Sequence, residues 1–304
     1  MDKKICIKID GLTKYYGQKK VVDNLNLEIP TGCVYGLLGR NGAGKSTTIR
    51  ILLGLAAADF GTAELLGCDS RELTPQIRGR IGYVNEGHNL YKFMNINEIR
   101  NFQKSFFPDT WNDRLFEQMI DFFELPIKSK IKHLSNGQRA QVSLALALAP
   151  EPELLIMDDP TLGLDVVIRR QFLEEMVRLI QHQGRTILFS SHILSDVERV
   201  ADRIGVIDKG RLRADCGLDT FRDCVRKIMF EFKDQPPQDP QIPGLLHLRK
   251  GEKRLEAVVV NTTDEQLDGW GRDNSLVGWS RIEMNLEDQF IEYTAGDKSK
   301  RLFQ

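Results

Sequence analysis

The sequence lacks the features that mark several protein classes. Its 304 residues include 5 cysteines, which are scattered and form no Cys-x-x-Cys pair. We therefore expect neither a disulfide framework nor a cysteine metal site. We expect the protein to lie in a reducing compartment. The longest apolar run, VSLALALA from Val142, is far shorter than a membrane span. The opening MDKKICIKID has lysines with no apolar run behind them, so we expect no signal peptide.

An excess of positive charge is also missing. The 42 Lys and Arg residues are balanced by 43 Asp and Glu residues, which gives a formal net charge of −1. A protein that binds nucleic acid by neutralising phosphates normally has a basic surplus, so we expect no nucleic-acid partner. Hydrophobic residues make up 41% and charged residues 28%, close to ordinary globular usage, which argues against wholesale disorder.

The first two thirds of the chain have the pattern of an α/β domain. Alternating apolar and polar residues predict half-buried antiparallel strands at 5–10 and 21–29. The apolar run GCVYGLLG predicts a buried strand, followed by a helix from about Lys45. Short apolar runs at 154–158 and 186–191 flank a helical segment from Arg169 to Gln183. This βαβ rhythm predicts a mostly parallel sheet flanked by helices.

A helical, aromatic-rich stretch from about Leu90 to Leu134 interrupts this pattern. It predicts a helical subdomain, about residues 88–148, inserted between two halves of the sheet. Because aromatic stripes at helical spacing usually pack inward, we expect most of these rings in its core. They are Tyr91, Phe93, Phe102, Phe106, Phe107, Trp111, Phe116, Phe122 and Phe123.

The chain changes character near residues 218–226. Strand-like alternation at 227–232, 254–260 and 279–284, together with LLHLRKG, surrounds a proline-rich loop at 234–244. A final amphipathic segment, LEDQFIEYT, is expected to be helical. We therefore predict a main domain at 1–220 and a small α+β accessory domain at 221–304.

The strongest local signal is GRNGAGKST, which follows an apolar strand, opens a helix and fits the P-loop pattern G-x-x-x-x-G-K-[ST]. Its glycines let backbone N–H groups turn toward phosphates, and the helix N-terminus favours an anion. The Lys45 ammonium is expected to reach the β- and γ-phosphates, and the Ser46 hydroxyl to bind Mg²⁺. The predicted ligands are therefore ATP and Mg²⁺. The ATP-binding residues expected here are Gly39, Asn41, Gly42, Gly44, Lys45, Ser46 and Thr47.

A second signal is the apolar strand LLIMDDP, which ends in Asp158. An aspartate in this place holds Mg²⁺ directly or through water, the Walker B arrangement. Many buried strands end in aspartate, so the pattern is weak alone. It gains weight because it lies downstream of a P-loop.

The remaining motifs complete a familiar order. LSNGQ, beginning at Leu134, resembles the signature motif of the ABC ATPases, usually LSGGQ. Asp158, then PTLGLD and then SSH follow it in that family's order, and the resemblance covers residues 1 to about 218. It implies a P-loop ABC ATPase core with N-terminal antiparallel strands, a mostly parallel sheet and a helical subdomain, in agreement with the insertion predicted above.

The resemblance also implies roles by position. Tyr16 stands where the family stacks an aromatic ring on adenine, and Tyr15 is the weaker candidate. Ser135, Gly137 and Gln138 open the signature helix, which faces the γ-phosphate bound by the other subunit. A serine hydroxyl at a helix N-terminus suits such an anion.

Two further positions follow from the same resemblance. Asp165 matches the loop that crosses the dimer interface, and His192 matches the histidine that contacts the γ-phosphate. For the other histidines we expect ordinary core or surface positions. They are His88, His133, His182 and His247.

Three residues depart from the family pattern. Asp159 replaces the usual glutamate general base, Glu86 replaces the usual glutamine that meets Mg²⁺, and Asn136 replaces the first signature glycine. The Asp159 side chain is about one bond shorter than that of the usual glutamate, so its carboxylate is displaced from the base position. A displacement of about 1 Å can cost about a hundredfold in rate. We therefore expect ATP binding to be kept. Either Glu86 is a metal ligand and hydrolysis is slow, or Glu86 shares the base role.

Three functions remain open. The favoured one is the ATP-binding and hydrolysing subunit of an ABC transporter, which dimerises over two ATP molecules and drives a membrane permease, in export. Its partners would be the permease and a second copy or another ABC ATPase, and it would lie in the cytoplasm at the inner face of the cell membrane. The alternatives are a slow ATP-dependent clamp or regulator, and a soluble ABC ATPase acting on nucleic acid or the ribosome.

Two segments favour the transporter. NLYKFMNINEIRNF resembles the region that receives a permease's coupling helix, where Tyr91, Phe93 and Met94 would either line the groove or pack in the core. The C-terminal appendage is similar to those of bacterial exporter ATPases encoded separately from their permease. Soluble relatives usually carry a long coiled coil or two cassettes, and neither is seen here. The cargo is not specified by the sequence.

Overall fold

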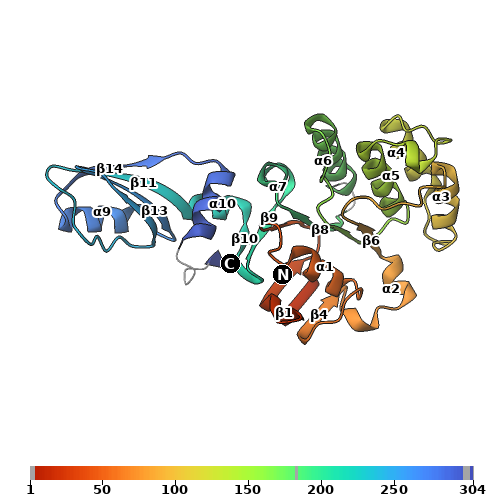
Figure 1. Cartoon of the computed structure of the whole chain (residues 1–304), viewed down its shortest axis with the longest axis horizontal. Coiled ribbons are helices and arrows are strands. Elements are labelled where there is room, and N and C mark those ends of the chain that lie inside the picture. The colour runs from red at the N-terminus through yellow and green to blue at the C-terminus, as the bar shows by residue number, and fades with distance from the viewer. Residues whose placement is uncertain (1–3, 182–183, 297–301, 304) are drawn as a thin grey trace. The chain divides into compact units, whose positions relative to one another are not determined.

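The computed structural model describes residues 4–181, 184–296 and 302–303 (Figure 1). It divides into two compact units, Met1–Leu212 and Arg213–Gln304. The boundary predicted from the sequence, after residue 220, falls within helix α8 (Leu218–Cys224).

The first unit begins with an antiparallel sheet of strand order β2-β1-β4-β5. In the β1–β2 pair Ile9 is the partner of Leu27, and both side chains are buried. The polar residues on either side of each in the sequence are exposed. The predicted half-buried strands are therefore confirmed, and both extend further than expected. Their bounds are β1 (Ile5–Tyr16), β2 (Lys19–Pro30), β4 (Phe60–Leu65) and β5 (Cys68–Asp69).

A parallel sheet of order β9-β3-β8-β7-β6 forms the centre of this unit. Strands β3, β7 and β8 are buried at every position, because a parallel sheet is covered on both faces. Leu38 pairs with Ser191 and Met157 with Phe189, so the carboxyl ends of these strands meet at one edge. The strands are β3 (Val34–Leu38), β6 (Ile81–Val84), β7 (Leu154–Met157), β8 (Thr186–Ser191) and β9 (Arg203–Asp208).

Helices fill the connections, and Figure 1 shows α3, α4 and α5 grouped beside β6. Helix α6 begins earlier than the expected Arg169, because the Asp165 carboxylate caps it; the expected end at Gln183 lies outside the described residues. The α-helices are α1 (Lys45–Leu52), α2 (Pro75–Gly79), α3 (Ile96–Lys104), α4 (Asp113–Phe122), α5 (Asn136–Leu148), α6 (Val166–Gln181) and α7 (Leu194–Val200). Short 3₁₀ turns are η1 (Ser70–Glu72) and η2 (Ile131–His133).

The expectation that most aromatics of the helical layer form its core is wrong. Of those rings only Phe116 is buried, while Tyr91, Phe93, Phe102, Phe106 and Phe122 are exposed. Aliphatic residues take the interior positions; they include Ile96, Ile99, Met119, Ile120 and Ile131. Three of the exposed rings instead contact one another edge to face, with the Phe102 centroid 5.5 Å from that of Tyr91 and 5.1 Å from that of Phe106.

The second unit is an antiparallel sheet of order β12-β13-β11-β14 with its own core. Phe230 and Phe232 of β11 pack on Trp270 of α9, a helix that the sequence analysis missed although Thr263 and Gln266 form a capping box at its start. Strand β10 (Arg211–Gly217) crosses the boundary and pairs in parallel with β15 (Leu302–Phe303). The other elements are β11 (Val225–Phe232), β12 (Leu245–Lys250), β13 (Arg254–Val260), β14 (Leu276–Ile282), α9 (Asp264–Asp273) and α10 (Leu286–Ala295).

None of the helices in the described parts of the chain has the length and apolar character needed to cross a bilayer.

Candidate nucleotide-binding site

The loop between β3 and α1 curls around a cavity of about 210 Å³. Gly44 has a φ of +112°, and a Cβ there would lie 2.8 Å from the Val21 carbonyl oxygen, so only glycine fits. The buried Lys45 ammonium donates to the Gly39 carbonyl oxygen at 2.9 Å. The phosphate loop and the N-terminus of α1 thus border this cavity, and a helix N-terminus favours an anion such as phosphate. The cavity is lined by Val21, Asn41, Gly42, Ala43, Gly44, Lys45, Ser46, Thr47, Glu86 and Asp159.

Asp158 directly follows β7, is buried and accepts hydrogen bonds from two hydroxyl groups. Its Oδ1 accepts hydrogen bonds from Ser46 Oγ at 2.9 Å and from Ser190 Oγ at 2.7 Å. Ser190 Oγ also accepts a bond from the Asp159 backbone N–H at 2.9 Å. Ser190 therefore holds both acidic residues in place, and the sequence analysis missed it. Its position near the end of the strand next to β7 is the signal that could have found it.

Asp159 joins the predicted histidine to the P-loop lysine. Its Oδ1 lies 2.9 Å from His192 Nδ1, and its Oδ2 lies 3.8 Å from Lys45 Nζ. The residue has a φ of +42°, an unusual backbone for a non-glycine, which is held by the bond from its N–H to Ser190. The Asp159 carboxylate thus lies beside both the Lys45 ammonium and the His192 imidazole, and each of these two groups can contact a bound phosphate.

Glu86 lies in the loop after β6, is exposed to solvent and lines the same cavity as Asp159. Tyr16, at the end of β1, is 50% exposed and lies beneath the Lys14 ammonium, 5.6 Å from the ring centroid, but does not line this cavity.

The signature residues do not line the cavity around this chain's own phosphate loop. Ser135 caps helix α5: its Oγ accepts from Gln138 N–H at 3.1 Å, while Gln138 Oε1 accepts from Ser135 N–H at 3.0 Å. A Cβ at Gly137 would lie 2.9 Å from the side chain of Ile168 in α6. The departing residue Asn136 is exposed and bonds Arg139.

A buried carboxylate links the loop after Asp159 to the helix after His192. Asp196 of α7 accepts a bond from Thr161 Oγ1 at 2.6 Å and pairs with Arg169 Nε at 3.3 Å. Burial raises the pKa of Asp196, an effect that the Thr161 hydroxyl and Arg169 oppose. Sequence reasoning did not find Asp196, because nothing local to it shows that two distant segments meet there.

Comparison with known proteins assigns the family. Residues 22–162 match the family model described as ABC transporter. The bacitracin transport ATP-binding protein BcrA of Bacillus licheniformis is 34% identical over 301 residues, which cover 95% of this chain and 97% of that protein. The chain belongs to the ABC transporter ATP-binding proteins. It is therefore an ATP-binding subunit and an ATPase, as the sequence predicted.

Two further comparisons agree. The Nod factor export ATP-binding protein I of Neorhizobium galegae is 31% identical and is matched over 97% of this chain and 87% of its own length. A solved structure of an ATP-binding subunit of an ABC transporter superposes with a TM-score of 0.64 at 28% identity, covering 72% of this chain and 92% of that one. The predicted ABC ATPase fold is confirmed.

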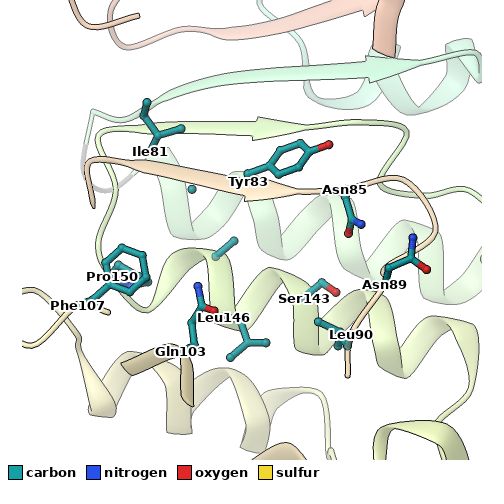
Figure 2. Close-up of a pocket in the computed structure, with 12 residues that line it drawn as sticks. Ile81, Tyr83, Asn85, Asn89, Leu90, Gln103, Phe107, Ser143, Leu146 and Pro150 are labelled. Carbon is teal, nitrogen blue, oxygen red and sulfur yellow. The ribbon is translucent and has the colours of Figure 1, made fainter. Parts of the chain in front are cut away.

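This ABC subunit has a second cavity, of about 370 Å³, between β6 and the helical layer. Figure 2 shows Asn85 and Asn89 at one end and Phe107 and Pro150 at the other. The hydroxyl of Ser143 is buried against it and has no hydrogen-bond partner among the described residues. The other lining residues are Ile81, Gly82, Tyr83, Leu90, Gln103, Leu146 and Ala147; Tyr91, Phe93 and Met94 are not among them.

The remaining histidines of the ABC subunit differ in environment, and both ring nitrogens of His88 are buried without a hydrogen-bond partner among the described residues. His88 is buried, and burial lowers its pKa to about 4. His133 is exposed, and His247 lies 2.9 Å from the Glu292 carbonyl oxygen. His182 lies outside the described residues.

Proposed function

We propose that two copies of this ATPase close over two ATP molecules, each held by the P-loop of one copy and the signature helix of the other. The supporting observation is the separation of the two half-sites. Lys45 and Asp159 line one cavity, whereas Ser135, Gly137 and Gln138 open a helix elsewhere on the same chain. A second chain must bring its own helix N-terminus to the phosphate, where the Ser135 hydroxyl and the helix dipole favour an anion.

In this proposal the phosphates sit where the P-loop backbone N–H groups converge, and the Lys45 ammonium moves from Asp159 to the β- and γ-phosphates. Asp159 takes the base position and orients the attacking water, while His192, held through Nδ1, contacts the γ-phosphate. Asp165 caps α6 through two bonds of 3.0 Å, which fixes the loop that would cross to the second copy. Tyr16, exposed at the end of β1, would stack on adenine.

The residues beside the P-loop fit Mg²⁺. Ser46 Oγ and Asp158 Oδ1 lie 2.9 Å apart, and hydroxyl and carboxylate oxygens are the ligands this ion prefers. Glu86, with a carboxylate on the same cavity, would supply another oxygen. When bound, the ion neutralises charge on the β- and γ-phosphates. No three His, Cys, Asp or Glu side chains of the described chain form a metal cluster by themselves, so phosphate oxygens would complete the set.

We further propose a membrane permease as the partner and export as the direction. The cavity between β6 and the helical layer is a pre-formed depression that an inserted segment would fill, offering its polar atoms to Ser143. Two relatives are named for bacitracin transport and Nod factor export. With such a permease, the subunit would lie in the cytoplasm at the inner face of the cell membrane.

The assembly is tested by analytical ultracentrifugation of the full chain with and without ATP and Mg²⁺. Asp159→Asn should form an ATP-dependent dimer, because hydrolysis is slowed while the phosphate contacts stay. Asp113→Asn, which removes the same charge in the helical layer, should dimerise only transiently. A dimer of this chain alone supports a homodimer, whereas dimerisation only with a second ABC ATPase supports a heterodimer. Monomers under every condition, with full ATPase activity, would refute the two-chain site.

A further inference from the structure

The helical layer carries a surface on which exposed lysines lie on two adjacent segments with exposed aromatic rings. Two segments form it, because Lys132 N–H donates to the Lys92 carbonyl oxygen at 3.2 Å and Ile131 N–H to the Met94 carbonyl oxygen at 2.9 Å. Asn95 and Lys130 also face each other in an isolated bridge. We call this the lysine–aromatic surface. Its members are Tyr91, Lys92, Phe93, Lys128, Lys130 and Lys132.

The positive charge of this surface is not balanced locally. Its lysines are all exposed, and no carboxylate of the described chain forms an ion pair with them. The nearby Glu98 accepts a bond from the Asn95 N–H at 2.8 Å in a helix cap. Asp113, the other acidic centre of the layer, pairs with Arg100 and Lys104 instead. The four lysines thus carry four positive charges without an ion pair among the described residues.

Large apolar side chains share the same surface. Tyr91 is 51% and Phe93 68% exposed, and their ring centroids lie 5.9 Å apart. The row continues along α3 through Phe102. It borders the cavity beside β6, since Leu90 lines that cavity directly before Tyr91 in the chain. Exposed apolar rings that lie beside charged residues are unfavourable in water, and such a patch indicates a site that binds another molecule or a membrane.

We propose that the lysine–aromatic surface binds the anionic headgroups of the membrane beside the permease, a location that rests on the proposed function. Lysines near an anionic leaflet are attracted without a fixed geometry, and aromatic rings favour the headgroup region. The surface has lysines and no arginine, whereas bidentate recognition of a protein carboxylate is typical of arginine. These features favour a phosphate-bearing lipid surface over an acidic protein segment.

Cosedimentation of the full chain with vesicles, in the absence of any permease, tests this proposal. The chain should bind vesicles of phosphatidylcholine mixed with phosphatidylglycerol, and not vesicles of phosphatidylcholine alone. Each lysine should contribute about fivefold to the partition coefficient, so combining Lys128→Gln, Lys130→Gln and Lys132→Gln should lower it about a hundredfold. Raising the salt from about 0.1 M to about 1 M should abolish binding, because the screening length falls from about 10 Å to about 3 Å.

The matched control carries Lys233→Gln, Lys250→Gln and Lys253→Gln, three exposed lysines of the second unit, and should bind like the unmodified chain. Phe93→Ser should weaken binding without changing its salt dependence. Equal binding by the triple variant and the control would overturn the proposal, as would binding that does not require phosphatidylglycerol. A triple variant that binds vesicles normally but no longer assembles with the permease in detergent would assign the surface to an acidic protein segment instead.

The same variant separates this inference from the proposed function. ATP-dependent dimerisation in vesicle-free solution does not involve the lysine–aromatic surface, so the triple variant should dimerise normally. Failure of Asp159→Asn to dimerise with ATP, alone or with a second ABC ATPase, would contradict the two-chain site and leave the vesicle result standing.

Discussion

Replacing Asp159 by asparagine should raise ATP affinity while it lowers turnover. The Asp159 carboxylate lies 3.8 Å from Lys45 Nζ, and the two side chains are 10% and 5% exposed. At an effective dielectric constant of about 20, unit charges at this distance attract by about 4 kcal/mol. Part of that attraction must be lost when Lys45 turns to the phosphates. The Asp159 carboxylate keeps its contact with His192, so only part of its electrostatic stabilisation is lost when ATP binds. We therefore expect Asp159→Asn to tighten ATP binding by about tenfold, or about 1.4 kcal/mol.

The turnover number should fall in the same variant by about 10²- to 10⁴-fold, since an amide cannot accept the proton of the attacking water. Calorimetric titration with ATP measures the first effect and steady-state phosphate release the second. Asp113→Asn is the control for loss of one negative charge and should change neither. Unchanged or weaker ATP affinity in Asp159→Asn would refute the reasoning about Lys45, and undiminished turnover would refute the base role.

Three other predictions concern the same unit. Lys45→Ala should lose ATP affinity along with activity, whereas His192→Ala should keep affinity and lose most turnover; unchanged affinity in Lys45→Ala, seen by calorimetry, would contradict the P-loop assignment. If Glu86 shares the base role, Asp159→Glu should raise the phosphate-release rate less than it does in a Glu86→Gln background, and additive changes in activation free energy would exclude such coupling. The pKa of His88 is lowered to about 4 from an unfolded value of about 6.5, so the folded state binds fewer protons between these values. Stability should therefore be complete above about pH 6.5 and fall by up to about 3 kcal/mol as the pH drops toward 4; His88→Asn should flatten this slope in denaturant titrations, and an unchanged slope would count against it.

Local patterns predicted several features that depend on residues close together in the chain. The P-loop could be identified because a phosphate cradle needs glycines, a lysine and a hydroxyl in one short run between a strand and a helix. The strand ending at Asp158 and the cap at Ser135 are likewise local, since a capping box needs only residues three apart. Alternation predicted β1 and β2, because one face of that sheet is buried and the other is not.

Tertiary structure decided what depends on residues far apart in the chain. Ser190 reaches Asp158 only because β7 and β8 lie side by side in the sheet, and Asp196 meets Thr161 only because α7 returns to the loop after β7. Burial of the aromatic residues could not be predicted from spacing, since whether a ring is inside depends on how much interior three short helices enclose. Aliphatic side chains fill that interior, so Tyr91 and Phe93 are left exposed beside the lysines.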